Sequence, residues 1–207
     1  MLIHRLGHLR TDESVVLGVV RGGVPLAYEI SQAMGMPLDV MLVRRMTVRN
    51  RPGVTMGALT EDGVRTPSRG LPGVSRCGLS DTTAAERVAT AELSRMVGLY
   101  RSAEPPMRLD GRTAVVVDDG VISTATAWAS CRAARARGAA RVVFAAPVIA
   151  PDAIACLAAV ADETARLVAP PTVSTIASWY EEGRPVTDEQ ALALLGRSPT
   201  GQALATL

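Results

Sequence analysis

One run of residues, from Val115 to Thr126, combines the residue types and spacing that could do chemistry: VVVDDGVISTAT. Two adjacent carboxylates, Asp118 and Asp119, directly follow three valines, and a turn rich in hydroxyl groups comes next. Adjacent acids repel one another, and burying an unpaired carboxylate is costly. A compensating partner is therefore expected, either sugar hydroxyls that donate hydrogen bonds or a Mg²⁺ ion.

The turn that follows the two acids favours a phosphate group. Free backbone N–H groups at the start of a helix attract anions, and the hydroxyls of Ser123, Thr124 and Thr126 could add donors. The alternative is that Asp118 and Asp119 only cap a turn or helix, which explains one acid well and two poorly. The pattern therefore favours a phosphosugar or nucleotide site.

The elements that would position this run alternate between strand and helix patterns. Continuous β-branched runs, typical of strands buried on both faces, occupy residues 15–20, 38–43, 113–117, 141–147 and 163–168. Helical spacing of apolar residues occurs at 24–34, 84–101, 126–137 and 152–160, and a capping signal at Thr187 begins a last helix. This alternation predicts an α/β protein with a mainly parallel sheet.

Residues 46–80 interrupt the alternation. The segment is rich in Gly, Pro, Ser and Arg, and only a part of it, near residues 54–59, could pair as a short hairpin. A loop of this length in a compact domain is usually functional or mobile. We expect it to be a flexible flap.

Composition and charge narrow the classes of partner. The 207 residues predict one domain. The 22 basic and 20 acidic residues leave a net charge of +2, which gives no case for binding nucleic acid or a membrane surface. The sequence contains no lysine, so Schiff-base chemistry is excluded.

The cysteine content predicts neither a disulfide framework nor a zinc site. Cys77, Cys131 and Cys156 are odd in number and widely spaced. A reducing, cytoplasmic compartment is the expectation. The most apolar stretch, residues 142–161, is interrupted by Pro147, Pro151 and Asp152, so no membrane span is expected.

The run VVVDDGVISTAT resembles the phosphoribosyl-pyrophosphate (PRPP) signature of type I phosphoribosyltransferases: a hydrophobic strand, two acids, three variable residues and Thr-Gly-x-Thr. The segment VVLGVVRGGVPLAYEISQAMGMPLDVMLVRRM is similar to the family's first strand–helix–strand unit, whose Arg-Gly-Gly turn forms the pyrophosphate loop. The tail SWYEEGRPVTDEQALALL is similar to the end of an uncharacterised subgroup of the family. The resemblance covers about residues 15–195.

The resemblance implies a single Rossmann-like α/β domain over residues 1–207. Its sheet would have about five strands flanked by helices, with the flap at about 46–80, a C-terminal helix at about 187–196 and a reduced acceptor-binding hood. It implies a Mg²⁺-assisted pentosyltransferase that transfers the 5-phosphoribosyl group of PRPP to an unidentified small-molecule acceptor and releases pyrophosphate. Dimers are common among similar proteins, so a homodimer is a further expectation.

The resemblance also implies roles for individual residues. Asp118 and Asp119 would contact the ribose 2′- and 3′-hydroxyls, directly or through a metal ion bound by way of PRPP. Arg45 would face the pyrophosphate. The turn that wraps the pyrophosphate, which often contains a non-proline cis peptide in relatives, would comprise Arg21, Gly22 and Gly23. The 5′-phosphate would be held by Ser123, Thr124, Ala125 and Thr126. PRPP would also be bound by the three residues before them, Gly120, Val121 and Ile122.

On the flap, Arg49 and Arg51 could stabilise the departing charge or could simply be solvated. Trp179 and Tyr180 could stack on an acceptor base or fill the core, and the core is the expectation for Trp179. Ile122 stands where hypoxanthine–guanine enzymes carry an Asp, so a 6-oxopurine acceptor is not expected.

The main departure from the family pattern is Thr124, which stands where relatives carry Gly. A β-branched residue would be strained at this position if a positive φ were required. Two alternatives to the enzyme therefore stay open: a ligand sensor or regulator with a weakened site, and a biosynthetic enzyme that uses another phosphosugar.

Overall fold

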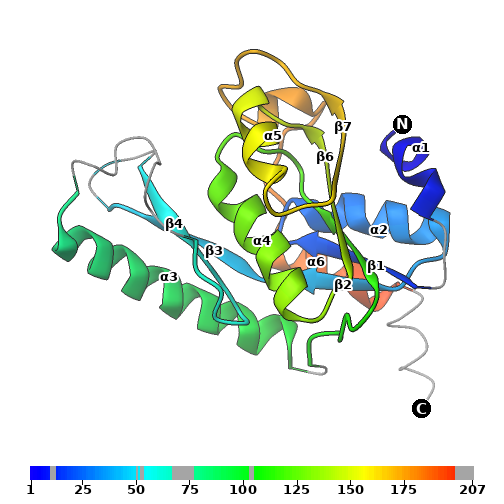
Figure 1. The fold of residues 1–207 in the computed structure, drawn as a ribbon. Helices are drawn as coiled ribbons and strands as arrows, with labels where there is room; N and C mark the ends of the chain where they lie inside the picture. The colour runs from blue at the N-terminus through cyan, green and yellow to red at the C-terminus, as the bar shows by residue number, and fades with distance from the viewer. Residues whose placement is uncertain (10–12, 50, 52–53, 67–76, 103–104, 199–207) are drawn as a thin grey trace.

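The computed structural model describes residues 1–9, 13–49, 51, 54–66, 77–102 and 105–198. Its centre is a five-stranded sheet in the order β2-β1-β5-β6-β7, in which every neighbouring pair is parallel (Figure 1). The strands are β1 (Ser14–Val19), β2 (Leu38–Met41), β5 (Thr113–Val117), β6 (Arg141–Val148) and β7 (Glu163–Val168). This confirms the predicted α/β class and the five-stranded parallel sheet.

Helices cover both faces of this sheet. Val15 and Leu17 of β1 pack in one core cluster with residues of α4 (Thr124–Ala136) and α5 (Pro151–Leu157). Between them, Val16 points to the opposite face and joins a cluster with residues of α1 (Leu2–Leu6) and α2 (Gly23–Met34). Strands buried on both faces explain why the sequence shows continuous apolar runs rather than alternation.

The segment expected to be a flap at 46–80 contains, among its described residues, the short hairpin that the sequence allowed near residues 54–59. Strands β3 (Val43–Thr47) and β4 (Thr55–Thr60) form an antiparallel hairpin, and α3 (Leu79–Tyr100) packs against both strands. Figure 1 shows the hairpin and α3 extending together to one side of the central sheet. Residues 50, 52–53 and 67–76 of the predicted flap lie outside the described residues.

The hairpin is stable in this position because β4 is buried along its whole length, between α3 and α4. The buried face of α3 is built from Ala85, Ala89, Leu93 and Met96. Val88, a larger apolar residue of the same helix, is 53% exposed. The buried face of α3 therefore includes two small alanines and leaves out Val88.

A buried ion network joins the arm formed by the β3–β4 hairpin and α3 to the central sheet. Arg101, just after α3, donates to the Asp39 carboxylate of β2 at 2.6 Å and to Glu61, just after β4, at 2.7 Å. Arg137, which follows α4, also donates to Glu61 at 2.7 Å. The side chains of Arg101 and Glu61 are only 8% and 4% exposed. Buried charges this close together are tolerated because each has a partner.

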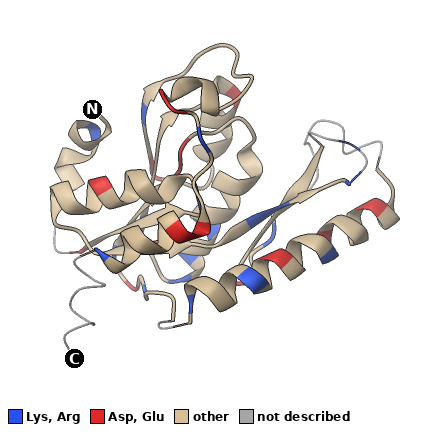
Figure 2. Ribbon diagram, turned by 180° about the vertical axis from the view of Figure 1, so that it is seen from behind, with Lys and Arg blue, Asp and Glu red and all other residues tan. Residues whose placement is uncertain are grey.

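The last described helix, α6 (Asp188–Gly196), packs against α2. The Thr187 hydroxyl accepts from the Gln190 N–H, and the Gln190 side chain accepts from the Thr187 N–H, as the capping signal predicted. Figure 2 shows basic and acidic residues interspersed along α3 rather than gathered by sign. Among the described residues, no helix combines the length and apolar character needed to cross a bilayer.

The strand order determines where a ligand is expected. From β1 the chain passes through α2 to β2 on one side, whereas β5 lies on the other side of β1. The connections that leave β1 and β5 therefore diverge and open a crevice at the carboxyl ends of these two strands. Ligands bind at such a switch point in open α/β sheets.

Candidate active site

A cavity of about 430 Å³ lies at the carboxyl ends of β1 and β5. It is larger than the neighbouring cavity that shares Val20 and Arg21 with it. Its lining includes most of the residues predicted from the sequence: Arg21, Gly22, Arg45, Asp118, Asp119, Gly120, Ile122, Ser123 and Thr126. These residues come from the loop after β1, from the loop after β5 with the first turn of α4, and from β3, so the fold brings together segments far apart in the chain.

The loops after β1 and β5 approach one another closely because two glycines leave room. A Cβ atom on Gly22 would lie 2.1 Å from Oδ2 of Asp119. A Cβ atom on Gly23 would lie 2.2 Å from the carbonyl oxygen of Val117, at the end of β5. The peptide bond between Val20 and Arg21 is cis, as the resemblance implied for this turn.

Two helices start at this cavity without a capping side chain. Gly22 is the N-cap of α2 and Ser123 is the N-cap of α4, and neither makes a side-chain capping hydrogen bond. Uncapped N-termini leave backbone N–H groups available to an anion. The cavity therefore offers two separate places for negatively charged groups.

The strain considered for Thr124 is not present. Thr124 is the first residue of α4, and no non-glycine residue in the described ranges has a positive φ. Thr124 and Ala125 do not line the cavity, whereas their neighbours Ser123 and Thr126 do. The difference from the family pattern is therefore accommodated by an ordinary helical backbone.

The two acids differ in their surroundings. Asp118 is buried, and its Oδ1 accepts a hydrogen bond from the Asp119 N–H at 2.9 Å. Burial, and then the negative charge of Asp119, raises the pKa of Asp118 well above its usual range, while the charge of Arg45 acts in the opposite direction. A cation or a set of hydroxyl donors would compensate the pair.

The donor set fits a Mg²⁺ ion that takes most of its ligands from elsewhere. No group of three or more His, Cys, Asp or Glu side chains capable of holding a metal exists among the described residues. Mg²⁺ typically binds through one or two carboxylates together with substrate phosphates and water. Asp118 and Asp119 could supply that minority share.

Several predicted residues do not line the cavity. The Val121 N–H donates to the Val148 carbonyl at 2.9 Å, so Val121 ties the loop to β6. Gly23 and the buried Ala125 provide the close packing behind the loop. Arg49 and Arg51, in the connection between β3 and β4, are exposed and stay predictions.

One whole wall of the cavity was not predicted from the sequence. Ser174, Thr175, Ile176 and Ala177, in the connection between β7 and α6, line it. This segment carries no periodic pattern, and only its polar Ser and Thr residues hinted at exposure to a ligand. Arg44 of β3, next to the predicted Arg45, was also missed.

The two aromatic residues after this wall behave differently from each other. Trp179 is 44% exposed, so the expectation that it fills the core was wrong. Tyr180 is half-buried and donates its hydroxyl to the backbone carbonyl of Asp119 at 2.7 Å.

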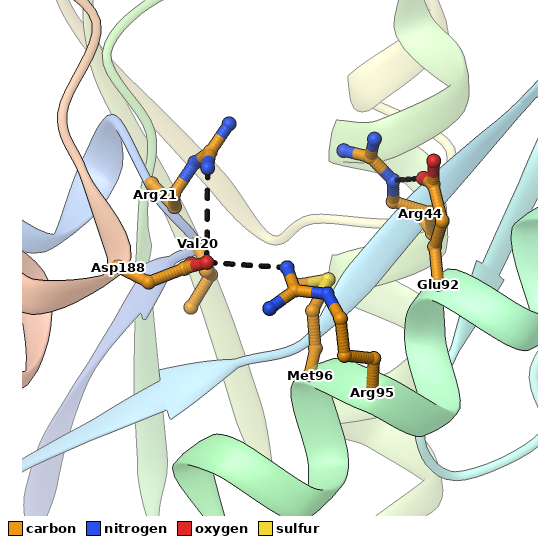
Figure 3. A pocket seen from close by; sticks show the side chains of 7 residues that line it. All are labelled: Val20, Arg21, Arg44, Glu92, Arg95, Met96 and Asp188. Carbon is orange, nitrogen blue, oxygen red and sulfur yellow. Dashed lines mark hydrogen bonds and ion pairs between the residues drawn. The ribbon is translucent and has the colours of Figure 1, made fainter.

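A second, smaller cavity of about 100 Å³ shares Val20 and Arg21 with the first (Figure 3). Asp188 lies between Arg21 and Arg95, with nitrogen–oxygen distances of 3.8 and 3.1 Å, and Arg44 pairs with Glu92 across the cavity. The Tyr100 hydroxyl donates to the other Asp188 oxygen at 2.9 Å. Arg21 thus stands between the two cavities.

Comparison with known proteins agrees with this geometry. The phosphoribosyl transferase domain matches residues 2–164. Two proteins from Mycobacterium tuberculosis strains CDC 1551 and H37Rv, provisionally named phosphoribosyl transferases, are each 37% identical over 197 residues, which is 95% of this chain. The chain spans 44% of the length of these relatives.

A similar solved structure is that of the protein TT1426 from Thermus thermophilus. It is 32% identical, with a TM-score of 0.75, and the match covers 94% of this chain and 92% of that chain. The chain therefore belongs to the phosphoribosyl transferase domain family, a family of transferases.

Proposed function

We propose that the protein is a phosphoribosyltransferase that uses PRPP, transfers its 5-phosphoribosyl group to a small-molecule acceptor and releases pyrophosphate. The observation that carries this proposal is the pair of uncapped helix starts, at Gly22 and Ser123, on one cavity. The two acids Asp118 and Asp119 lie in the loop that leads to the second of these starts. A sugar with an anionic group at each end and hydroxyls between them matches this distribution of charge.

The residues divide between binding and charge stabilisation. The Arg21–Gly23 turn would hold the pyrophosphate through backbone N–H groups and the Arg21 guanidinium. Ser123 and the first turn of α4, as far as Thr126, would hold the 5′-phosphate. Asp118 and Asp119 would accept hydrogen bonds from the ribose hydroxyls and so position C1′ for attack.

The transition state of such a transfer is expected to carry positive charge on the ribose ring and growing negative charge on the leaving pyrophosphate. Arg21 and Arg45, which both line the cavity, would stabilise the leaving group. When bound with PRPP, Mg²⁺ would supply further positive charge at the pyrophosphate. The carboxylates would favour positive charge on the ring. The flap would exclude water, which otherwise competes with the acceptor.

The acceptor side of the cavity is neutral. Ile122, Ile176 and Ala177 are apolar, and Ser174 and Thr175 offer hydroxyls. None of the described side chains on this wall is a carboxylate, so none of them is a candidate general base.

Pyrophosphate release tests the proposal. The protein is incubated with PRPP, Mg²⁺ and a panel of purine bases, pyrimidine bases and amines, and pyrophosphate is followed by a coupled assay. We expect release that depends on an acceptor and is lost in the variant Asp118→Asn/Asp119→Asn, with the fold checked by circular dichroism. Undiminished release in that variant would contradict the site assignment. Tight PRPP binding without release favours the sensor, and release only with another phosphosugar favours the alternative enzyme.

A further inference from the structure

The segment between β7 and the end of α6, residues 169–196, returns to both loops of the switch point. The family match ends at residue 164, so it assigns nothing to this segment. One contact reaches the loop after β5 through Tyr180, and another reaches the loop after β1 through Asp188. The contacts lie on opposite sides of the crevice between β1 and β5.

The Tyr180 contact restrains the backbone of Asp119, the second of the two adjacent acids. Its hydroxyl donates to the Asp119 carbonyl, and Ile176 fills the space beside Gly120, where a Cβ atom would lie 2.5 Å from the Ile176 Cδ1. A fixed peptide plane after Asp119 restricts the direction of its side chain.

The Asp188 contact restrains the guanidinium of Arg21, in the loop after β1. Both carboxylate oxygens of Asp188 are occupied, one by Tyr100 and one by Arg95, so its orientation is restrained from α3 (Figure 3). Although burial acts to raise the pKa of Asp188, hydrogen bonds from Tyr100 and Arg95 lower it below the ordinary value, so the carboxylate is ionised. Arg21, a long and partly exposed side chain, lies against this restrained charge.

We propose that residues 169–196 act as a brace for the switch point, in which Tyr180 positions Asp119 for ribose hydroxyls and Asp188 positions Arg21 for pyrophosphate. The assignment of ligands rests on the proposed function. The two positioning residues act through other residues and affect different halves of the ligand. Their effects therefore separate when each half is offered alone.

The test uses calorimetry with four ligands: PRPP with Mg²⁺, ribose 5-phosphate, 2-deoxyribose 5-phosphate and inorganic pyrophosphate with Mg²⁺. Tyr180→Phe removes one hydroxyl, and Tyr28→Phe is its matched control, because the Tyr28 hydroxyl makes no hydrogen bond among the described residues. Asp188→Asn removes one charge in the first turn of α6, and Glu189→Gln, an exposed residue in the same turn, is its control.

We expect the two variants to weaken the binding of different ligands. Tyr180→Phe weakens the binding of ribose 5-phosphate about three- to tenfold, in line with the loss of one hydrogen bond. It weakens the binding of 2-deoxyribose 5-phosphate less and leaves the binding of pyrophosphate unchanged. Asp188→Asn weakens pyrophosphate about two- to tenfold, in line with the cost of ordering one long side chain, and leaves ribose 5-phosphate unchanged. PRPP is weakened by both variants, and the controls bind as the wild type does.

The brace would be rejected by an equal loss of affinity for all ligands or by no loss at all. It would also be rejected if Asp188→Asn bound pyrophosphate more tightly. Amide hydrogen exchange of residues 118–123 in the ligand-free protein gives a readout that does not depend on the proposed function. Faster exchange in Tyr180→Phe than in Tyr28→Phe supports the brace even if the wild type binds no PRPP. In that case the proposed function is rejected and the brace is retained. Unchanged hydrogen exchange in Tyr180→Phe would reject the brace.

Discussion

Gly22→Ala is expected to damage ligand binding while leaving the fold intact. Gly22 has φ −62° and ψ −32°, which alanine adopts freely. The new Cβ atom, however, would lie 2.1 Å from Asp119 Oδ2, where an ordinary contact begins near 3.4 Å. The carboxylate must therefore retreat by about 1.3 Å. Losing the hydrogen bonds that Asp119 would accept from the ribose hydroxyls costs about 1.5–3 kcal/mol, so the Kd for PRPP should rise by about 10- to 100-fold.

The assay pairs PRPP calorimetry with thermal unfolding of three alanine variants. Gly22→Ala should keep a Tm near that of the wild type, because only the Asp119 side chain must move. Gly23→Ala places a Cβ atom 2.2 Å from the Val117 backbone oxygen, so it should lose about 1–3 kcal/mol of stability. Gly98→Ala, an exposed helical position with open space, should gain up to about 1 kcal/mol and bind normally. Wild-type PRPP affinity in Gly22→Ala would refute the close approach as a functional feature.

Two further predictions concern stability. Burial and the charge of Asp119 raise the pKa of Asp118, so the folded protein binds this proton more tightly than the unfolded chain does. The resulting stabilisation is complete below the unfolded pKa of about 3.9 and is lost as the pH rises through the folded pKa. Asp118→Asn should therefore raise the Tm of the ligand-free protein by about 2–4 °C at pH 7, and a gain that persists undiminished below pH 4 would contradict this. Arg101→Met should cost about 3–5 kcal/mol in urea unfolding, because it leaves the buried carboxylates of Asp39 and Glu61 without a main partner; a loss below about 1 kcal/mol would show that Arg137 compensates.

The central sheet and the run of site residues were predictable because local patterns determine them. The predicted bounds of β5 (Thr113–Val117) and β7 (Glu163–Val168) agree with the structure, since β-branched runs flanked by turn residues have few other solutions. The order of elements then places the carboxyl ends of β1 and β5 side by side. Asp118, Asp119 and Arg21 meet there as expected.

The sequence allowed a short hairpin near residues 54–59 and a helix at 84–101, but tertiary contacts determine how the hairpin and α3 pack and where the far wall of the cavity lies, so these were not predictable. Strand β4 contains Gly57 with a positive φ and is held by burial between two helices rather than by its own pattern. The wall at residues 174–177 contains no strand or α-helix, only the start of a short 3₁₀ helix (Ala177–Trp179), and Trp179 is exposed on that helix. Thr124 shows the reverse case, in which a departure from the family pattern is accommodated by a helix start.

The most direct measurement of the central claim is a calorimetric titration of PRPP into the protein, with and without Mg²⁺, against ribose 5-phosphate. If the two uncapped helix starts and the acids form one PRPP site, PRPP binds at micromolar concentration, binds more tightly than ribose 5-phosphate and depends on Mg²⁺. Absence of PRPP binding, or equal binding of the monophosphate with no effect of Mg²⁺, would contradict the proposed function.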